Sequence, residues 1–249
     1  MPGANFKIAV VSDIHGNTWA LKAVLTDIKK RGIDKILNLG DSLYGPLAPA
    51  ETADLLIRHD ILSVSGNEDR IIIEKDGKSG YSETLQYVRN SLGYEHRRWL
   101  KSLPFSTTVY SDIFLCHGTP GRDDEYFFWI IFKDGKIKKA ESELLDLVQA
   151  VEEPLILYGH DHTPNMVTIS QSKLAVNPGS VGLQAYTDDT PYFHFMETGK
   201  PHARYSIISR ENSGWVVEFF SVEYDWDTAA KTAKKITGPT GRSGSEPAG

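Results

Sequence analysis

Seven Asp, Asn and His residues follow apolar segments of this chain, and such side chains are common metal ligands in proteins. They are Asp13, His15, Asp41, Asn67, His117, His160 and His162. Imidazole and carboxylate ligands together favour Mn, Fe, Zn or Ni over Ca or Mg. Taken singly, each residue has an ordinary interpretation, since an Asp or Asn after a strand often forms a turn or caps a helix. Their recurrence after five separate apolar segments favours a metal site.

The segments before these residues are predicted to be strands. They are residues 6–12, 35–41, 61–67, 154–160, and 106–118, the last forming a hairpin that turns at Ser111-Asp112. Apolar residues at helical spacing predict helices between them, over 17–31, 49–59, 82–103 and 140–151. Alternating strands and helices indicate parallel βαβ units, and ligands of open α/β sheets bind at the carboxyl ends of the strands. The polar residues are therefore expected to meet at one edge.

Several apolar segments after residue 160 suit antiparallel strands. We therefore expect one α/β domain over residues 5–236, mainly parallel in its first half and mainly antiparallel in its second. Residues 237–249 are rich in Gly, Pro and Ser, which predicts a disordered tail.

The composition narrows the class of protein. Of the 249 residues, 40% are hydrophobic, which suffices for a sizeable core, and the net charge of −6 argues against a general nucleic-acid binder. Cys116 is the only cysteine, so no intrachain disulfide can form. The first residues read as a strand rather than a signal peptide, and no apolar segment approaches the length of a membrane span. We expect a cytoplasmic protein.

Six short motifs resemble, in the same order, the blocks of the calcineurin-like metallophosphoesterases, and most closely those of the small bacterial and archaeal phosphodiesterases. The motifs are SDIHGN (12–17), LGDSLYGP (39–46), SGNED (65–69), CHGTP (116–120), YGHDH (158–162) and NPGSVG (177–182). The resemblance implies a four-layer α/β/β/α sandwich with mixed sheets. It also implies hydrolysis of phosphate esters, with phosphodiesters or nucleotide-type small molecules as substrates.

The resemblance further implies two divalent metal ions, with Mn or Fe preferred and Ni or Zn as alternatives. One ion would bind Asp13, His15, Asp41 and His162, and the other would bind Asp41, Asn67, His117 and His160. Asp41 would bridge the two. Such a centre activates water and clamps the oxygens of an in-line phosphoryl displacement. Asp41, Asn67 and His117 are thus implied to be catalytic.

Glu68 occupies a position where many family members carry a His that helps the leaving group depart. A carboxyl group beside two cations is expected to stay ionised, which makes it a poor general acid. Glu68 is therefore a candidate catalytic residue with three open roles: a substrate-side or structural carboxylate, a metal ligand, or a proton donor. A missing acid favours diesters or pyrophosphate-type substrates over monoesters. Asp69 is expected to lie at a helix N-terminus.

Three further residues are candidates for binding substrate: Asn17, Tyr44 and Arg122. Residues 118–141 have two interpretations, a surface excursion packed on the sheet or a lid in which Arg122 binds phosphate. His194 and His202 are expected to be structural.

Two other functions remain open at this point. One is a non-catalytic scaffold of the same fold, which Glu68 favours and the full ligand set disfavours. The other is a Ser/Thr protein phosphatase, which Glu68 and the modest chain length both disfavour. A homo-oligomer is compatible with the apolar strands near the C-terminus, which fit a core equally well.

Overall fold

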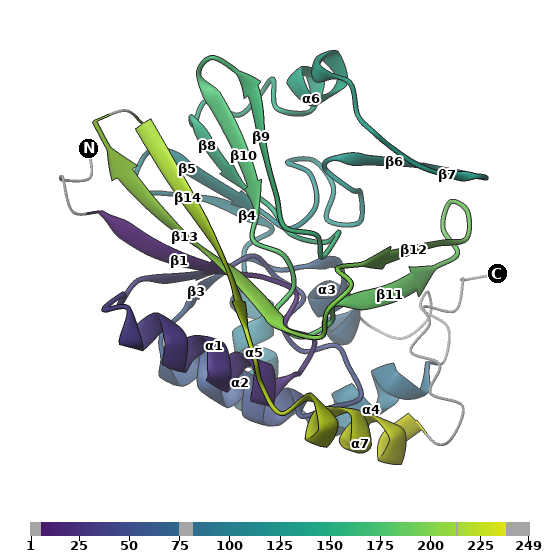
Figure 1. Ribbon diagram of the computed structural model, residues 1–249. Coiled ribbons are helices and arrows are strands. Elements are labelled where there is room, and N and C mark those ends of the chain that lie inside the picture. Colours follow the sequence, from purple (N-terminus) through teal and green to yellow (C-terminus); the bar gives the residue numbers. More distant parts are fainter. Residues whose placement is uncertain (1–5, 75–81, 213, 238–249) are drawn as a thin grey trace.

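Two five-stranded sheets lie face to face and carry helices on their outer faces (Figure 1). The computed structural model describes residues 6–74, 82–212 and 214–237. Within these residues the expected α/β/β/α sandwich with mixed sheets is confirmed, and no helix is both long enough and apolar enough to cross a membrane. The expected tail, from residue 238 on, lies outside the described residues.

The first sheet has the strand order β14-β13-β1-β2-β3. Its strands are β1 (Lys7–Val11), β2 (Ile36–Asn38), β3 (Leu62–Ser63), β13 (Ala203–Glu211) and β14 (Gly214–Val222). β1, β2 and β3 run parallel, while β13 pairs antiparallel with β1, and β14 pairs antiparallel with β13. The carboxyl ends of the three parallel strands therefore lie at one edge, as the sequence predicted.

The second sheet has the order β4-β5-β8-β10-β9. Its strands are β4 (Ser106–Val109), β5 (Ile113–Cys116), β8 (Leu155–Leu157), β9 (Asn165–Ser170) and β10 (Lys173–Asn177). β5, β8 and β10 are parallel to one another, so the second half of the chain, expected to be mainly antiparallel, also holds a parallel pair of β8 with β10. The reason is that β10 pairs with β8 on one side and turns back on β9 on the other.

The two outer layers differ in thickness. One consists of α1 (Thr18–Lys30), α2 (Pro49–Arg58), α3 (Asn67–Ile73), α4 (Glu83–Ser91), α5 (Tyr94–Ser102) and α7 (Trp226–Thr237). The other holds a single short helix, α6 (Glu141–Leu147), assisted by the buried rings of Phe127 and Phe128. Between the two sheets, apolar side chains such as Val10, Leu115 and Leu157 form a fully enclosed core.

Two predictions about helices need correction. The helical pattern over 82–103 forms two helices, α4 and α5, because Leu92 leaves the helical conformation and Gly93 begins the next helix as its N-cap. α7 was not predicted, although its apolar residues Trp226, Ala229, Ala230, Ala233 and Ile236 recur at helical spacing.

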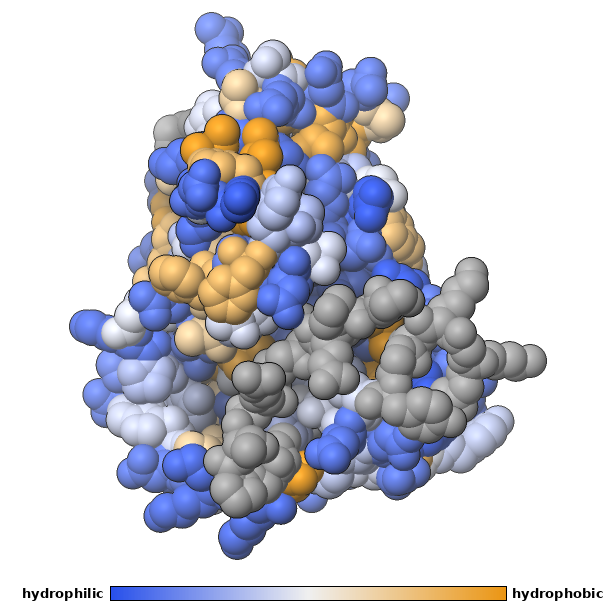
Figure 2. Space-filling model, turned by 90° about the vertical axis from the view of Figure 1, so that its right-hand side faces the viewer, coloured by the Kyte–Doolittle hydropathy of each residue, from blue (hydrophilic) through white to orange (hydrophobic). Residues whose placement is uncertain are grey.

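Two hairpins project from the sandwich on the same side (Figure 1): β6 (Trp129–Phe132) with β7 (Gly135–Lys138), and β11 (Ala185–Asp188) with β12 (His194–Glu197). This face of the molecule mixes apolar and charged side chains (Figure 2), with Ile137, Phe193 and Phe195 among the exposed apolar ones. The inward side of β12 instead buries His194 and Met196.

Candidate metal centre

The seven predicted ligands meet at the carboxyl ends of five strands. Asp13 and His15 follow β1, Asp41 follows β2, Asn67 follows β3, His117 follows β5, and His160 and His162 follow β8. Three groups of side chains offer atoms within 4.8 Å of one another: Asp13, His15 and His162; Asp41, His117 and His160; and His15, Asp41 and Glu68. Asp41 and His15 each belong to two of these groups, so the group of His15, Asp41 and Glu68 links the other two.

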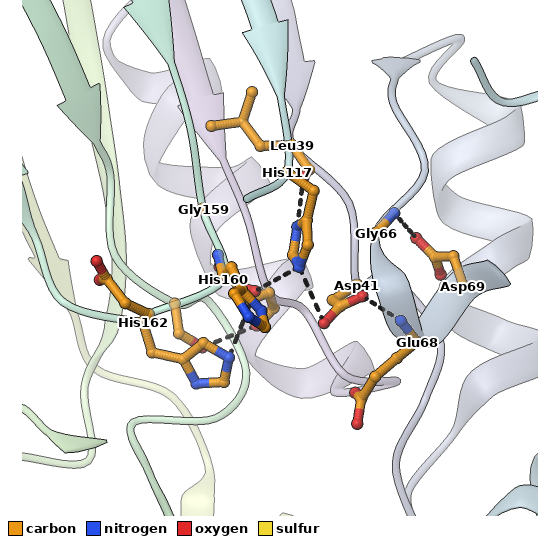
Figure 3. A network of polar contacts seen from close by, with 12 residues as sticks. Leu39, Asp41, Gly66, Glu68, Asp69, His117, Gly159, His160 and His162 are labelled. Carbon is orange, nitrogen blue, oxygen red and sulfur yellow. Dashed lines mark hydrogen bonds and ion pairs between the residues drawn. The ribbon is translucent and has the colours of Figure 1, made fainter. Parts of the chain in front are cut away.

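Short distances connect the groups. His117 Nε2 lies 3.1 Å from Asp41 Oδ2 and 3.9 Å from Asp13 Oδ1. On the other side, His162 Nε2 lies 3.4 Å from Asp13 Oδ1 and 3.1 Å from His15 Nε2. Figure 3 shows His117 between the Leu39 carbonyl and Asp41, with Glu68 just beyond. The polar ends of these side chains thus converge on one small region.

Three of the histidines have a defined tautomer. The Nδ1 atoms of His15, His117 and His162 lie 2.9, 2.8 and 2.7 Å from the backbone carbonyls of Tyr44, Leu39 and Leu183. Since a carbonyl oxygen can only accept, each neutral ring carries its proton on Nδ1 and leaves Nε2 free. A hydrogen bond of this kind typically orients a metal-binding histidine.

Several converging atoms are buried without a well-formed hydrogen bond within the described residues. They include Asn67 Oδ1, together with Asp13 Oδ1 and His117 Nε2, which lie 3.4 Å from His162 Nε2 and 3.1 Å from Asp41 Oδ2, respectively, themselves members of the predicted ligand set. Buried polar atoms without a partner are rare, and each costs about 1–3 kcal/mol. Buried oxygen and imidazole nitrogen atoms without a hydrogen-bond partner are suitable ligands for a divalent cation. The residues present therefore fit a metal site.

The backbone at the site is unusual as well. Five of the seven residues have a positive φ, between 49° and 69°: Asp13, His15, Asp41, His160 and His162. Such conformations cost non-glycine residues about 1–3 kcal/mol each and concentrate at functional sites. A left-handed loop after β1 brings Asp13 and His15 together.

Loops that carry the ligands pack too closely for larger residues. A Cβ at Gly66 would lie 2.1 Å from Asp41 Oδ1, and one at Gly159 would lie 2.1 Å from Ser12 Oγ and 3.0 Å from Asp13 Oδ2. Glycine is therefore required at both positions by close approach.

Asp69 fastens two of these loops. It is fully buried at the start of α3, where Oδ1 accepts from Ser42 N at 3.0 Å and Oδ2 accepts from Gly66 N at 3.2 Å. Burial raises the pKa of the Asp69 carboxyl to about 7. The expected place at a helix N-terminus is confirmed, and the side chain also joins the loop after β2 to the loop after β3.

The segment 177–182 fastens the loop after β1. Ser180 Oγ donates to Asp13 O at 2.8 Å, and Gly182 N donates to the same oxygen at 3.0 Å. Asn177 donates to Gly159 O and to Asp161 Oδ1, both at 2.9 Å, and so holds the loop of His160 and His162. The motif NPGSVG thus holds two of the loops that carry the ligands.

Carboxylates dominate the electrostatics of the site. Burial opposes protonation of His117 and His15, but Asp41 beside the first and Glu68 beside the second raise the pKa values to about 10 and about 9. Burial, with help from His117, lowers the pKa of His160 to about 4. The negative field that holds protons on two of these histidines also attracts a cation.

Glu68 lies within reach of the ligands. Its backbone N–H donates to Asp41 Oδ1 at 2.9 Å, and its Oε2 lies 3.0 Å from His15 Nδ1. Burial raises the pKa of the Glu68 carboxyl to about 6, whereas cations bound beside it would lower that pKa. The three roles considered from the sequence all remain geometrically possible for this side chain.

A pocket of about 390 Å³ opens above the site. Its lining includes His15, Asp41, Asn67, Glu68, His160 and His162, together with Tyr44, Leu47, Tyr126, Leu183, Tyr186 and part of α7. Of the three substrate candidates, Tyr44 lines this pocket, and its hydroxyl lies 3.1 Å from Ser82 Oγ.

The other two candidates need correction. Asn17 is buried and caps α1 by accepting from Ala20 N at 3.1 Å, so its side chain is used within the protein. Arg122 is exposed outside the pocket and pairs with Asp124 at 3.0 Å. Within residues 118–141, Phe127 stacks on Tyr158 at 4.3 Å, which supports packing on the sheet, whereas Tyr126 does reach the pocket.

Sequence reasoning missed Tyr126 and Tyr186. The Tyr126 ring lies 4.9 Å from the His160 ring, and the Tyr186 ring lies 4.5 Å from the His162 ring. The Tyr126 hydroxyl lies 2.8 Å from that of Tyr186 and 2.9 Å from His194 Nε2. His194 is thus structural, as expected, but its position supports the pocket wall. No motif around these tyrosines could have indicated this.

Comparisons with known proteins agree with this geometry. A family model described as the calcineurin-like phosphoesterase superfamily domain matches residues 6–200. An uncharacterized protein of Methanocaldococcus jannaschii is 29% identical over 231 residues, which cover 88% of each chain. The crystal structure of a metallophosphoesterase from Sphaerobacter thermophilus is 26% identical, with a TM-score of 0.72 over 95% of this chain and 96% of that one.

A further crystal structure is described as a candidate diadenosine tetraphosphatase. It is 21% identical, with a TM-score of 0.54 over 90% of this chain and 96% of that one, and this similarity shows the shared fold alone. The family model covers most of the chain and all seven strand-end residues. The chain therefore belongs to the calcineurin-like phosphoesterase superfamily.

Proposed function

We propose that this protein is a metal-dependent phosphoesterase that uses a dinuclear centre to hydrolyse phosphodiester or nucleotide-type phosphate substrates. One observation carries the proposal: two neighbouring Asp/His groups are linked through His15 and Asp41, and several of their ligand atoms are buried without a hydrogen-bond partner. Membership of the superfamily implies divalent metal ions, and the chemistry of these donors fits them.

In this proposal, Asp13, His15, Asp41 and His162 hold one ion, and Asp41, Asn67, His117 and His160 hold the other. Two such ions supply a water of lowered pKa and neutralise charge on a phosphoryl group. Manganese or iron is the preferred metal, with nickel or zinc as alternatives.

The chain itself keeps the ligands in place. Backbone carbonyls orient three imidazoles through Nδ1, so that each presents Nε2 to the region where the groups meet. Asp69 and Ser180 fix the loops that carry Asp41 and Asp13. This arrangement orients the ligands before substrate arrives, and pre-organised charge is the main source of stabilisation in such reactions.

Glu68 determines which leaving groups are favoured. It lines the pocket beside Asp41 and His15, where bound cations would keep it ionised. An ionised carboxylate cannot donate a proton to a departing alkoxide. We therefore propose that aryl diesters and pyrophosphate-type esters, whose leaving groups need little protonation, are hydrolysed better than alkyl monoesters.

The test is hydrolysis of a bis-aryl phosphodiester and of its monoester counterpart by chelator-stripped protein reloaded with Mn, Fe, Ni or Zn. Asp41→Asn is expected to lower kcat/KM by roughly a thousandfold, since several kcal/mol of charge stabilisation would be lost. Asp60→Asn is the matched control, because Asp60 is exposed and shares the positive φ of Asp41.

Glu68→His tests the second part of the proposal. If position 68 faces the leaving group, the His variant should gain monoester hydrolysis by roughly tenfold or more, since general acid catalysis typically contributes 10²–10⁴. Better hydrolysis of an alkyl monoester than of the aryl diester by the unaltered protein would contradict the preference. Two bound ions without turnover of any ester would favour the scaffold function instead.

A further inference from the structure

α7 forms one wall of the pocket, and it lies beyond the residues 6–200 that the family model matches. Ala230, Ala233 and Lys234 are the helix residues that line the pocket. Ala233 and Lys234 lie three and four residues after Ala230, so both neighbour Ala230 on the surface of α7. The two alanines leave room there, and Lys234 is the one charged residue of the three.

α7 is anchored close to the metal centre. Asn17 Nδ2 donates to Gly182 O at 3.0 Å and to the Tyr224 hydroxyl at 3.3 Å. Gly182 lines the pocket, and Tyr224 lies two residues before α7 begins. Asp225 caps the helix, since its Oδ1 accepts from Thr228 N at 3.0 Å and its Oδ2 accepts from Thr228 Oγ1 at 2.7 Å. The position of α7 relative to the pocket is thus set by specific hydrogen bonds.

Lys234 differs in charge from the rest of the lining. Among the residues that the structure describes, it is the single lysine or arginine that lines the pocket, whereas Glu68 and Asp188 add carboxylates. In the proposed function, a phosphate ester would bind the cations held by the Asp, Asn and His ligands at the floor of the pocket. A second anionic group, away from the reacting phosphorus, would find its positive partner only on α7.

We propose that Lys234 binds a second anionic group of the substrate, such as a further phosphate of a nucleoside polyphosphate or of another pyrophosphate-type ester. This inference rests on the proposed function, because the first phosphate is placed at the metal centre. α7 then selects for substrates with two anionic groups over simple diesters with one. The ammonium group is exposed, so it can follow an anion over a range of distances on its flexible stem.

The test uses binding rather than turnover. Metal-loaded full-length protein is titrated calorimetrically with methylphosphonate and with a series of α,ω-alkylene diphosphonates that carry one to five methylene groups. These probes contain no ester or anhydride bond to hydrolyse. The variants are Lys234→Met and Lys234→Arg, and Lys235→Met is the control, because it removes the same charge from the adjacent exposed position outside the pocket.

At the spacer length that reaches Lys234, we expect Lys234→Met to weaken diphosphonate binding about fivefold, which corresponds to an ion pair of about 1 kcal/mol. Lys234→Arg should retain most of the affinity, and methylphosphonate should bind equally to all variants. Equal diphosphonate affinity in Lys234→Met and Lys235→Met at every length would overturn the inference. So would a wild-type protein that binds no diphosphonate better than methylphosphonate.

Hydrolysis of the bis-aryl diester is measured on the same preparations. Lys235 lies outside the pocket, so Lys235→Met should leave the kcat/KM for this ester unchanged. Absence of diester hydrolysis in the wild type would refute the proposed function, whereas Lys234-independent diphosphonate binding would refute only the role of α7.

Discussion

The floor and the walls of the pocket are built in different ways. The floor consists of Asp, Asn and His residues that are fixed by left-handed backbone, by close glycine contacts and by Asp69. The walls consist of Tyr126, Tyr186 and one face of α7, which are contributed by a loop, a hairpin and a C-terminal helix. The floor is therefore specified by residue type and backbone geometry together, and the walls by packing and by hydrogen bonds between distant parts of the chain.

This difference assigns the two regions different tasks. The strained backbone and unpartnered ligand atoms of the floor cost stability in the absence of a cation. The walls use ordinary side chains with satisfied hydrogen bonds, such as the Tyr126 hydroxyl between Tyr186 and His194. Metal binding should thus strongly affect the floor, while changes in the walls should alter binding and positioning with smaller effects on stability.

Metal removal is expected to have the largest effect. A ligand present at 100 times its Kd stabilises the folded state by about 2.7 kcal/mol. For a chain of this size, that corresponds to a fall in Tm of about 5–10 °C when the metal is stripped. Thermal unfolding with and without chelator, followed by re-addition of Mn, measures it. An unchanged Tm would mean that the floor does not depend on a cation, which would remove the contrast with the walls.

Asp69→Asn should have the next largest effect. The amide can present only one acceptor oxygen to Ser42 N and Gly66 N, so a buried donor loses its partner at a cost of about 1–3 kcal/mol. Urea unfolding of the chelator-stripped protein should show this loss. Asp146→Asn, at an exposed position of α6, is the control and should change stability by less than about 0.5 kcal/mol. Equal midpoints for the two variants would show that Asp69 does not hold the loops.

The contrast also explains what could be predicted from the sequence. Asp13, Asp41 and His117 follow apolar strands, and strand ends of a parallel sheet share an edge, so their meeting was predictable. The left-handed conformation of Asp13 was not, because an Asp after a strand is compatible with several turns. Tyr126 and Phe127 are adjacent aromatic residues, but Tyr126 lines the pocket and Phe127 packs in the core. The sequence does not show which of the two faces the pocket.

Asn17 shows a further limit. The sequence places it beside His15, which suggested contact with substrate, but its side chain turns to cap α1 and to hold Tyr224. Tyr224 is more than 200 residues away, and pairing over such a separation leaves no local pattern in one sequence. Residues that follow a strand end can thus be assigned to the site region, but their individual roles depend on long-range contacts.

Tyr126→Phe should have the smallest effect and tests the wall directly. The ring can keep its place 4.9 Å from the His160 ring, while the hydroxyl contacts with Tyr186 and His194 are lost. Loss of a typical hydrogen bond costs about 0.5–1.5 kcal/mol. Since Tyr186 also contacts His160 O and lies against His162, we expect the weaker of the two proposed metal sites to lose affinity about fivefold.

Metal titration of Tyr126→Phe measures this loss. Tyr192→Phe is the control, because Tyr192 is exposed at the end of the β11-β12 hairpin that carries Tyr186. Because the phenylalanine fills the same space, the melting temperature of the stripped protein should fall by only a few degrees. A large fall in that temperature with unchanged metal affinity would assign the hydroxyl to folding instead. Reduced affinity at a nearly constant temperature would show that the wall positions the ligands of the floor.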